Sequence, residues 1–389
     1  MGRHYVAMAR EGAKYSAVVV GGGPAGITIV GNLLEQRLPG RVLWVDPLFK
    51  AGRVNAKYRE VPSNTAVKLF IQFAEAVKPF RDVIKSTPEP NAVSVLRQMR
   101  QDKGCELSRA ADMNLMLTEG LSKTDGVQQT LGYVSAAVFN EQANHWTVAL
   151  DQGQIPVTTS RLILCTGSSP ISFPLPIQER MHDLNLESVD LDTCLAPSLL
   201  PKALSPSATV AVIGASHSAI LVLRNLYNLA RDSHPQLRIK WFTRNPLRYA
   251  VPMDGWILRD NTGLKGEAAD WARENLEDNE FANSPVSKYI QKVSMTKGDE
   301  DSVYEKELPG CTHIVQAVGY KRDPIPKLSI RDGVAGEEPL SAWVPGLFGA
   351  GIAYPERVTD PYGNVEYAVG FWKFMRFAKR VVPEWVQGP

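Results

Sequence analysis

Early in the chain stands a turn of small residues with the spacing G-x-G-x-x-G: Gly21, Gly23, Pro24, Ala25 and Gly26. Such a turn lets the backbone come close to a pyrophosphate, which then lies on the positive N-terminus of the following helix. The motif alone is a weak signal, but its context fits. An apolar run from Tyr15 to Val20 precedes it, and a helical pattern from Ile27 to Gln36 follows it. The residues therefore predict a strand, turn and helix that bind a dinucleotide.

An acid completes this pattern. The next expected strand, Arg41 to Val45, ends in Asp46, which lies 20 residues after Gly26. At that place a carboxylate accepts hydrogen bonds from the adenosine ribose of a dinucleotide. The alternative is a structural turn beside a surface acid, and we give it little weight because both requirements of context are met.

A second turn repeats the first with small residues in place of some glycines: Gly214, Ser216, His217 and Ser218. It follows a strand expected at Thr209 to Ile213 and precedes a helix that runs to about Leu229. The next strand ends in Thr243 and Arg244, and a cation there favours NADPH over NADH because an acid would repel the 2′-phosphate. Two alternatives remain: Arg244 faces solvent, or His217 is polar filling of a loop rather than a cofactor contact.

Composition narrows the function classes. The chain has 389 residues and a net charge of +2, with no feature of a nucleic-acid-binding protein. Its first 16 residues contain no apolar run, so we expect neither a leader nor an integral membrane segment, and hence a cytoplasmic enzyme. Four scattered cysteines form no C-x-x-C pair, and six dispersed histidines predict no metal site. The sequence leaves the oligomeric state open, a homo-oligomer included.

The two turns indicate an α/β fold with two Rossmann-like domains. We expect one dinucleotide-binding domain at residues 1–206 and 308–389, and a smaller inserted NAD(P)H-binding domain at 207–307. Hairpin strands are expected between Thr130 and Leu164. Two further strands should each end in a sharp turn of small residues. One turn contains Cys165, Thr166 and Gly167, and the other contains Val318 and Gly319.

Four segments together resemble the two-dinucleotide-binding flavoproteins, and among them the class B flavin monooxygenases, which include flavin-containing monooxygenases and amine N-hydroxylases. They are Gly21 to Gly26 with Asp46, Tyr58 to Thr65, Cys165 to Gly167, and Ala317 to Tyr320 with Gly346 to Gly351. The resemblance implies FAD at the first turn, aided by Thr166, Gly167, Gly319, Gly351 and Ile352, and NADPH at the second. It implies molecular oxygen and a small organic substrate as reactants.

The Tyr58 to Thr65 segment bears on the reaction type, because it resembles the Tyr-x-x-x-x-x-Asn-Thr stretch of the flavin-containing monooxygenases. The resemblance implies that Asn64 lies beside the flavin as a catalytic residue. The alternative, an Asx-turn or helix cap ahead of Ala66, is equally weighted.

Departures from the family pattern keep three functions open. The fingerprint F-x-G-x-x-x-H is absent between Ser172 and Asp183, and Ile352 stands where an acid usually follows Gly351. The first expectation is an NADPH-dependent monooxygenase that works through a flavin C4a-(hydro)peroxide. The others are a flavin reductase without oxygen insertion and a nucleotide-sensing flavoprotein without turnover.

Near the C-terminus an aromatic stripe alternates with basic residues, from Tyr367 to Arg380. We interpret it as core packing with a solvated basic face, which includes Lys373, rather than as a membrane-surface helix. The segment from Arg244 to Trp256 is a candidate border of a cleft between the domains.

Overall fold

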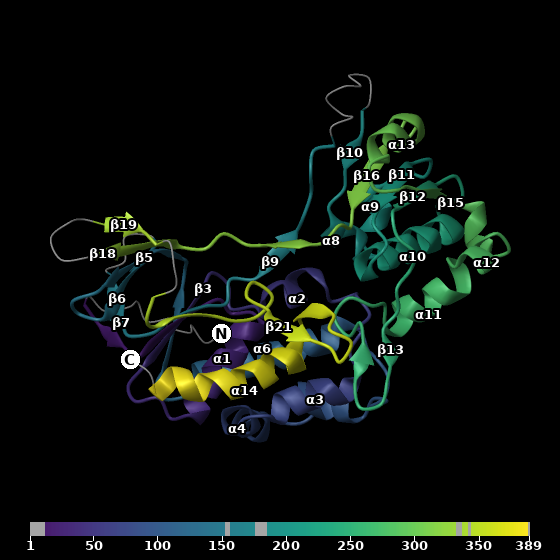
Figure 1. Ribbon diagram of the computed structural model, residues 1–389. Helices are drawn as coiled ribbons and strands as arrows, with labels where there is room; N and C mark the ends of the chain where they lie inside the picture. Colours follow the sequence, from purple (N-terminus) through teal and green to yellow (C-terminus); the bar gives the residue numbers. More distant parts are fainter. Residues whose placement is uncertain (1–11, 152–155, 176–184, 332–336, 341–343, 388–389) are drawn as a thin grey trace.

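A computed structural model describes residues 12–151, 156–175, 185–331, 337–340 and 344–387, and shows two lobes (Figure 1). The first lobe is built on a parallel sheet in the order β20-β8-β2-β3-β4. Its strands are β2 (Ala17–Val20), β3 (Val42–Asp46), β4 (Val127–Leu131), β8 (Leu162–Leu164) and β20 (Leu347–Gly349). The predicted α/β fold with parallel sheets is confirmed.

Helices cover one face of this sheet and enclose the largest core. They are α1 (Pro24–Glu35), α2 (Gly52–Lys57), α3 (Val67–Glu75), α4 (Lys78–Ser86), α5 (Ala92–Arg97), α6 (Leu107–Ser122) and α14 (Phe371–Gln387). In α14, Phe371 packs edge-on against Phe70 and Phe73, at centroid distances of 5.4 and 5.5 Å. The predicted aromatic stripe is thus partly core, because one side of α14 faces the sheet, whereas Tyr367 lies exposed on a strand before the helix.

A second sheet, in the order β1-β7-β6-β5-β18-β19, packs on the other face. Its strands are β1 (Lys14–Tyr15), β5 (Val134–Asn140), β6 (His145–Leu150), β7 (Val157–Thr159), β18 (Lys327–Arg331) and β19 (Glu337–Pro339). Strands β5, β6 and β7 pair antiparallel. The hairpins expected from alternating residues are therefore present, and β4 and β8 at their two ends belong to the parallel sheet.

The second lobe has a parallel sheet in the order β10-β16-β11-β12-β15. The strands are β10 (Glu187–Ser188), β11 (Thr209–Ile213), β12 (Arg238–Thr243), β15 (Ile290–Ser294) and β16 (His313–Gln316). Around it lie α8 (Leu191–Cys194), α9 (Leu200–Ala203), α10 (His217–Asp232), α11 (Gly266–Asn275), α12 (Asp278–Phe281), a 3₁₀ turn (Pro285–Lys288) and α13 (Glu300–Glu307). This sheet extends beyond the expected interval 207–307, because β10 and β16 hydrogen-bond to it and not to the first lobe.

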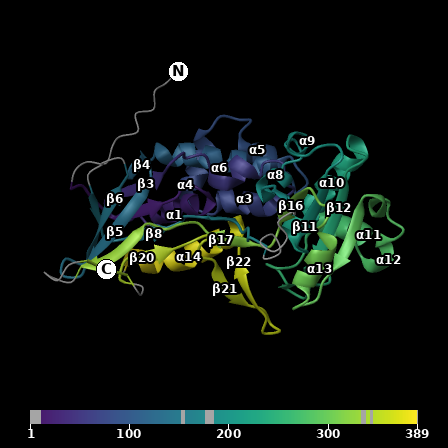
Figure 2. The ribbon, with the colours of Figure 1, turned by 90° about the horizontal axis from the view of Figure 1, so that it is seen from above.

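Two chain segments cross between the lobes as an antiparallel pair, β9 (Ser168–Pro170) and β17 (Tyr320–Arg322) (Figure 1). Each lobe also carries a hairpin, β13 (Val251–Pro252) with β14 (Ile257–Leu258) in the second lobe and β21 (Glu356–Thr359) with β22 (Val365–Ala368) in the first. Figure 2 shows the β21–β22 hairpin projecting from the body of the molecule. The lobes also contact each other away from the β9–β17 pair, since Arg53 of α2 forms an ion pair with Asp192 of α8 and Val61 packs into the core of the second lobe.

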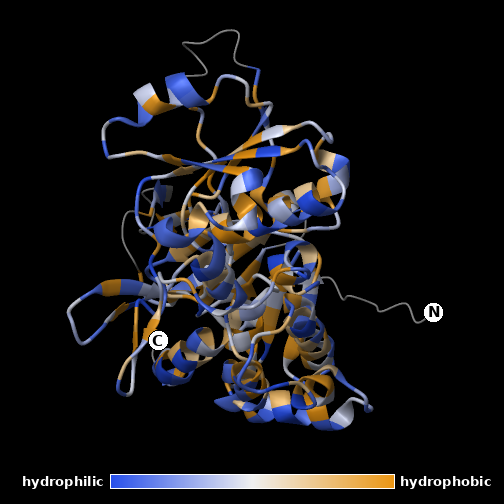
Figure 3. Cartoon of the chain, turned by 90° about the vertical axis from the view of Figure 1, so that its right-hand side faces the viewer, coloured by the Kyte–Doolittle hydropathy of each residue, from blue (hydrophilic) through white to orange (hydrophobic). Residues whose placement is uncertain are grey.

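Colouring by hydropathy shows apolar residues in the strands and on the inner faces of the helices (Figure 3). Within the described ranges no helix combines the length and the apolar character that crossing a membrane requires. Residues 1–11, to which the expectation of no leader applies, and 176–184, which make up much of the Ser172 to Asp183 segment, lie outside the described residues.

Candidate dinucleotide sites

The first glycine turn is held by close backbone contacts that leave no room for side chains. Gly21 has φ +114°, and a Cβ there would lie 2.3 Å from the carbonyl oxygen of Cys165. A Cβ on Gly26 would lie 1.9 Å from the carbonyl oxygen of Gly21. Both positions therefore require glycine, since any side chain would push α1 away from β2 and β8.

The start of α1 presents free backbone donors. Gly23 is the N-cap residue and Pro24 is the first helical residue. No side chain caps this end and no acid stands in the first turn. Because the first N–H groups of a helix lack partners within the helix, this terminus suits an anion such as a pyrophosphate.

At the end of β3, Asp46 lies beside the turn. One carboxylate oxygen accepts a hydrogen bond from the N–H of Gly22 at 2.6 Å. The other accepts from the N–H groups of Leu48 and Phe49, at 2.9 and 2.6 Å. A carboxylate offers about four acceptor positions. Asp46 is thus fixed by the backbone and keeps acceptor capacity for a ribose.

The second turn has the same construction. Gly214 has φ +134°, and its Cβ would lie 2.4 Å from the carbonyl oxygen of Ala317. Its N–H donates to Phe242 at 3.0 Å, as that of Gly21 donates to Val45 at 2.8 Å. Ser216 is the N-cap of α10 without a side-chain cap bond, and Ser218 is the second residue of that helix. The second lobe therefore offers an equivalent site for an anion.

Two tryptophans that the sequence reasoning missed hold these turns. The indole N–H of Trp44 donates to the carbonyl of Gly21 at 2.8 Å, and that of Trp241 donates to the carbonyl of Gly214 at 2.7 Å. Both side chains are fully buried. A signal was present, because each tryptophan stands two residues before the end of the strand that follows its turn.

The Cys165 to Gly167 exit lies next to the first turn. The hydroxyl oxygen of Thr166 is buried, and the part of the chain that the structure describes offers it no hydrogen-bond partner. Gly167 and Gly319 both have positive φ, +84° and +118°, at the two ends of the β9–β17 link. A buried hydroxyl without a partner is costly, so Thr166 fits a site whose ligand supplies the missing bond.

Gly351 meets the first turn from the other side. With φ +84°, its Cβ would lie 2.4 Å from the Cβ of Ala25 in α1. The next residue, Ile352, exposes 37% of its surface. Glycine at 351 thus keeps the turn open, and any contact from residue 352 to a cofactor is made by backbone or by an apolar side chain.

His217 opens helix α10. Its Nδ1 is buried, with no partner among the described residues. Burial and, after it, the nearby ammonium of Lys265 lower the pKa of His217 to about 4. The ring is therefore neutral at pH 7 and has one free nitrogen beside the second turn.

This pKa has a consequence for stability. In the unfolded chain His217 takes up a proton below pH ~6.5, whereas in the folded chain it does so only near the lowered pKa. The stability that the neutral ring contributes is therefore complete above the unfolded pKa and is lost as the pH falls toward the folded one. We expect His217→Gln to reduce the loss of unfolding free energy between pH 7 and pH 5 by up to about 2 kcal/mol, as measured by urea unfolding. The control His145→Gln, in the other lobe, should leave the loss unchanged; an equal change in both would contradict the assignment.

Arg244 lies just beyond the end of β12. Its guanidinium is paired with Glu300 at 3.3 Å, and 57% of its side chain is exposed. Glu300 is the first residue of α13, and hydrogen bonds from its own and the Gly298 backbone lower its pKa. Arg244 is thus accessible to a 2′-phosphate, although a phosphate bound there would also lie near the carboxylate of Glu300.

Asn64 lies on an exposed loop. Its amide oxygen accepts a 3.3 Å hydrogen bond from Thr65, and helix α3 begins after Ala66 with no side-chain cap bond. The alternative of a helix cap is therefore not seen. The loop is fixed on one side, because Ser63 donates its N–H to Cys105 at 2.8 Å and accepts a bond from the Cys105 N–H at 3.2 Å.

The four cysteines, Cys105, Cys165, Cys194 and Cys311, are free and buried. Burial raises the pKa of each thiol, that of Cys194 to about 12. A buried thiol with a raised pKa is a poor nucleophile. The geometry therefore offers two dinucleotide turns without a dithiol between them.

Comparisons with known proteins agree with this construction. Residues 15–234 match the family model described as pyridine nucleotide-disulphide oxidoreductase. A curated relative, "Monooxygenase AgnR1" of Paecilomyces divaricatus, is 54% identical over 395 residues, which cover 96% of this chain and 98% of the relative.

Solved structures show weaker likenesses. The OTEMO complex with FAD and NADP aligns over 61% of this chain and 40% of its own, with 18% identity and a TM-score of 0.42. Lactococcus lactis thioredoxin reductase aligns over 96% and 99%, with 14% identity and a TM-score of 0.47. At these TM-scores the two structures add no argument, and the family model and the curated relative carry the assignment.

Proposed function

Because the chain belongs to the pyridine nucleotide-disulphide oxidoreductase family, we propose that it is an FAD- and NADPH-dependent monooxygenase that oxygenates a small organic substrate through a flavin C4a-(hydro)peroxide. The observation that carries the proposal is the pair of like-built dinucleotide turns without a cysteine pair. Without a dithiol, electrons from NADPH would pass to the flavin and from the flavin to oxygen. The monooxygenase name of a relative that is 54% identical over nearly the whole chain supports oxygen insertion.

Each proposed contact rests on the geometry of this chain. The N–H groups after Gly23 would bind the FAD pyrophosphate, Asp46 its ribose, and the hydroxyl of Thr166 a polar group of the cofactor. Bound FAD supplies hydride acceptance and the activation of oxygen. In the second lobe the start of α10 would bind the NADPH pyrophosphate, with Arg244 near its 2′-phosphate.

Asn64 is proposed to act on the flavin through its exposed amide, which has one hydrogen bond within the protein. An amide both donates and accepts, so it can bind reduced flavin and nicotinamide alike. Asn64→Ala should raise hydrogen peroxide release per NADPH oxidised by about 2- to 10-fold, the effect of one hydrogen bond. The control Asn279→Ala, on the exposed helix α12, should leave it unchanged. Equal peroxide release by wild type and Asn64→Ala would remove Asn64 from the site.

The proposed function is tested with a panel of amines, sulfides and ketones. A substrate should accelerate NADPH oxidation and yield a product that carries one atom from isotopically labelled oxygen gas. Faster NADPH oxidation with an unlabelled product would instead support a reductase without oxygen insertion.

A further inference from the structure

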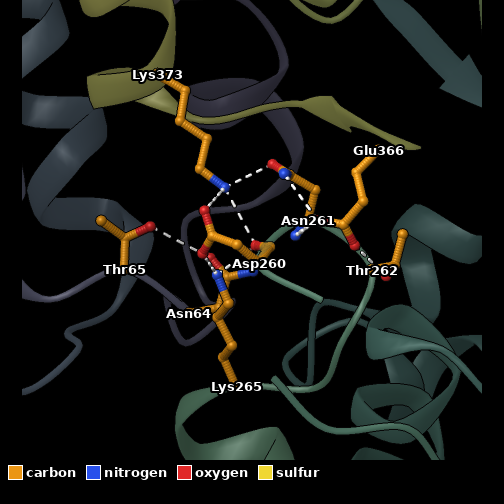
Figure 4. Close-up of polar contacts among 8 residues, drawn as sticks. All are labelled: Asn64, Thr65, Asp260, Asn261, Thr262, Lys265, Glu366 and Lys373. Atoms are coloured by element: carbon orange, nitrogen blue, oxygen red, sulfur yellow. Dashed lines mark hydrogen bonds and ion pairs between the residues drawn. The ribbon is translucent and has the colours of Figure 1, made fainter. Parts of the chain in front are cut away.

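A polar cluster joins the two lobes at a distance from their β9–β17 link, and we call it the clamp (Figure 4). The second lobe contributes Asp260, Asn261, Thr262 and Lys265 from the loop after β14, and the first lobe contributes Glu366 of β22 and Lys373 of α14. Each lobe supplies one carboxylate to the clamp, and each carboxylate accepts hydrogen bonds from donors of the other lobe.

Glu366 is the buried member of the clamp, with 6% of its surface exposed. Its Oε2 accepts bonds from the backbone N–H and the side-chain amide of Asn261, at 3.0 and 3.1 Å. Its Oε1 accepts a bond from the hydroxyl of Thr262. All three donors belong to the second lobe, so this carboxylate is committed to the interface between the lobes.

Lys373 adds a cation from the first lobe. Its ammonium donates to Asn261 at 2.6 Å and pairs with the carboxylate of Asp260 at 2.8 Å. Lys265 binds the same carboxylate. Burial raises the pKa of Asp260, but hydrogen bonds from Lys265 and Lys373 outweigh it and keep the pKa below its usual value. Asp260 is therefore ionised at neutral pH.

The clamped loop continues directly to the candidate site. A Cβ on Gly266 would lie 3.3 Å from the carbonyl oxygen of Ser63 and 3.7 Å from the Cα of Asn64, so the backbones of the two lobes touch there. The next residue, Glu267, pairs with Arg224 of helix α10 at 3.0 Å. The clamp is thus connected on one side to Asn64 and on the other to the helix that begins at the second turn.

We propose that Glu366 is a positioning residue, which with Lys373 holds the loop 260–266 and the second nucleotide turn against the Asn64 segment so that the hydride donor faces the flavin. This inference rests on the proposed function. Transfer between two bound reactants needs them about 3–3.5 Å apart, and a misplacement of about 1 Å costs roughly 100-fold in rate. The lobes are also joined by the β9–β17 pair and by the ion pair of Arg53 with Asp192, so loss of the clamp would loosen the loop 260–266 at the Asn64 segment without separating the lobes.

The test compares Glu366→Ala with Glu356→Ala. Glu356 lies on the same hairpin but pairs with Arg380 of its own lobe, so it is a matched control. At saturating NADPH without oxygen, flavin reduction should be about 10- to 100-fold slower in Glu366→Ala, with unchanged FAD content. Glu366→Gln keeps an oxygen acceptor, so its rate of flavin reduction should lie between those of the wild type and Glu366→Ala. Flavin reduction in Glu366→Ala as fast as in the control would overturn the proposal.

A second readout does not depend on turnover. Hydrogen exchange of residues 259–266 in the FAD-loaded protein without nucleotide should accelerate in Glu366→Ala and stay at the wild-type rate in Glu356→Ala. Unchanged exchange in both variants would show that Glu366 does not hold the loop. A wild-type flavin that NADPH does not reduce, with exchange still accelerated in Glu366→Ala, would refute the proposed function and leave the clamp supported.

Discussion

Replacing Gly23 with alanine should yield a folded protein that is depleted of FAD. Gly23 has an ordinary φ of −79°, and the nearest heavy atom to an added Cβ is the Cα of Gly52, 3.9 Å away. Among the residues that the structure describes, nothing therefore opposes the methyl group. The pyrophosphate would, because the second glycine of the motif is where the backbone approaches it. A methyl group forced into such a contact costs about 1–3 kcal/mol, or roughly 10- to 100-fold in affinity.

The measurement is the ratio of flavin to protein after purification, together with the thermal midpoint in the presence and absence of added FAD. Gly26→Ala is the matched comparison, since its Cβ would lie 1.9 Å from the Gly21 carbonyl oxygen and 3.3 Å from the Trp44 indole nitrogen. That variant should lose stability whether or not FAD is present. A Gly23→Ala protein that keeps wild-type FAD content would place the cofactor elsewhere.

Arg244→Ala should change the choice between the two nicotinamide coenzymes. A guanidinium that pairs with a phosphate contributes about 1.5–3 kcal/mol. Removing it also leaves the acid of Glu300 without its partner at 3.3 Å, and this acid would then repel a 2′-phosphate. We expect the KM for NADPH to rise about 10- to 100-fold, with little change for NADH.

Arg238→Ala is the matched control, because Arg238 begins the same strand at its opposite end and bonds to backbone carbonyls of Pro235 and Leu237. It should leave both KM values at the wild-type level. If Arg244→Ala raises the KM for NADPH and the KM for NADH by the same factor, the 2′-phosphate does not bind at this strand end.

The two turns could be predicted because their chemistry is local. Glycine spacing, the preceding strand and the acid 20 residues on lie within one short stretch of sequence, and each requirement follows from backbone geometry. The close contacts that an added Cβ would make at Gly21, Gly26 and Gly214 agree with that reasoning. The FAD and NADPH contacts of these turns remain predictions that the two experiments above address.

The clamp could not be predicted, because its partners are far apart in the chain. Glu366 and Asn261 are separated by 105 residues. The spacing of the basic residues near the C-terminus predicts a solvated face that includes Lys373, but Lys373 pairs with Asp260 across the interface between the lobes. The parallel sheet of the second lobe extends past residue 307 for a similar reason, since β16 follows the inserted segment in sequence but pairs with β11. Periodicity identifies a strand and not its neighbours.

The proposed monooxygenase activity is tested most directly by reducing the purified protein with NADPH in the absence of oxygen and then admitting air while the flavin spectrum is recorded. We expect NADPH to bleach the bound flavin faster than NADH does, and an oxygenated flavin species to appear before the oxidised spectrum returns. Immediate return of the oxidised spectrum with one hydrogen peroxide per NADPH, or a protein that contains no flavin, would contradict it.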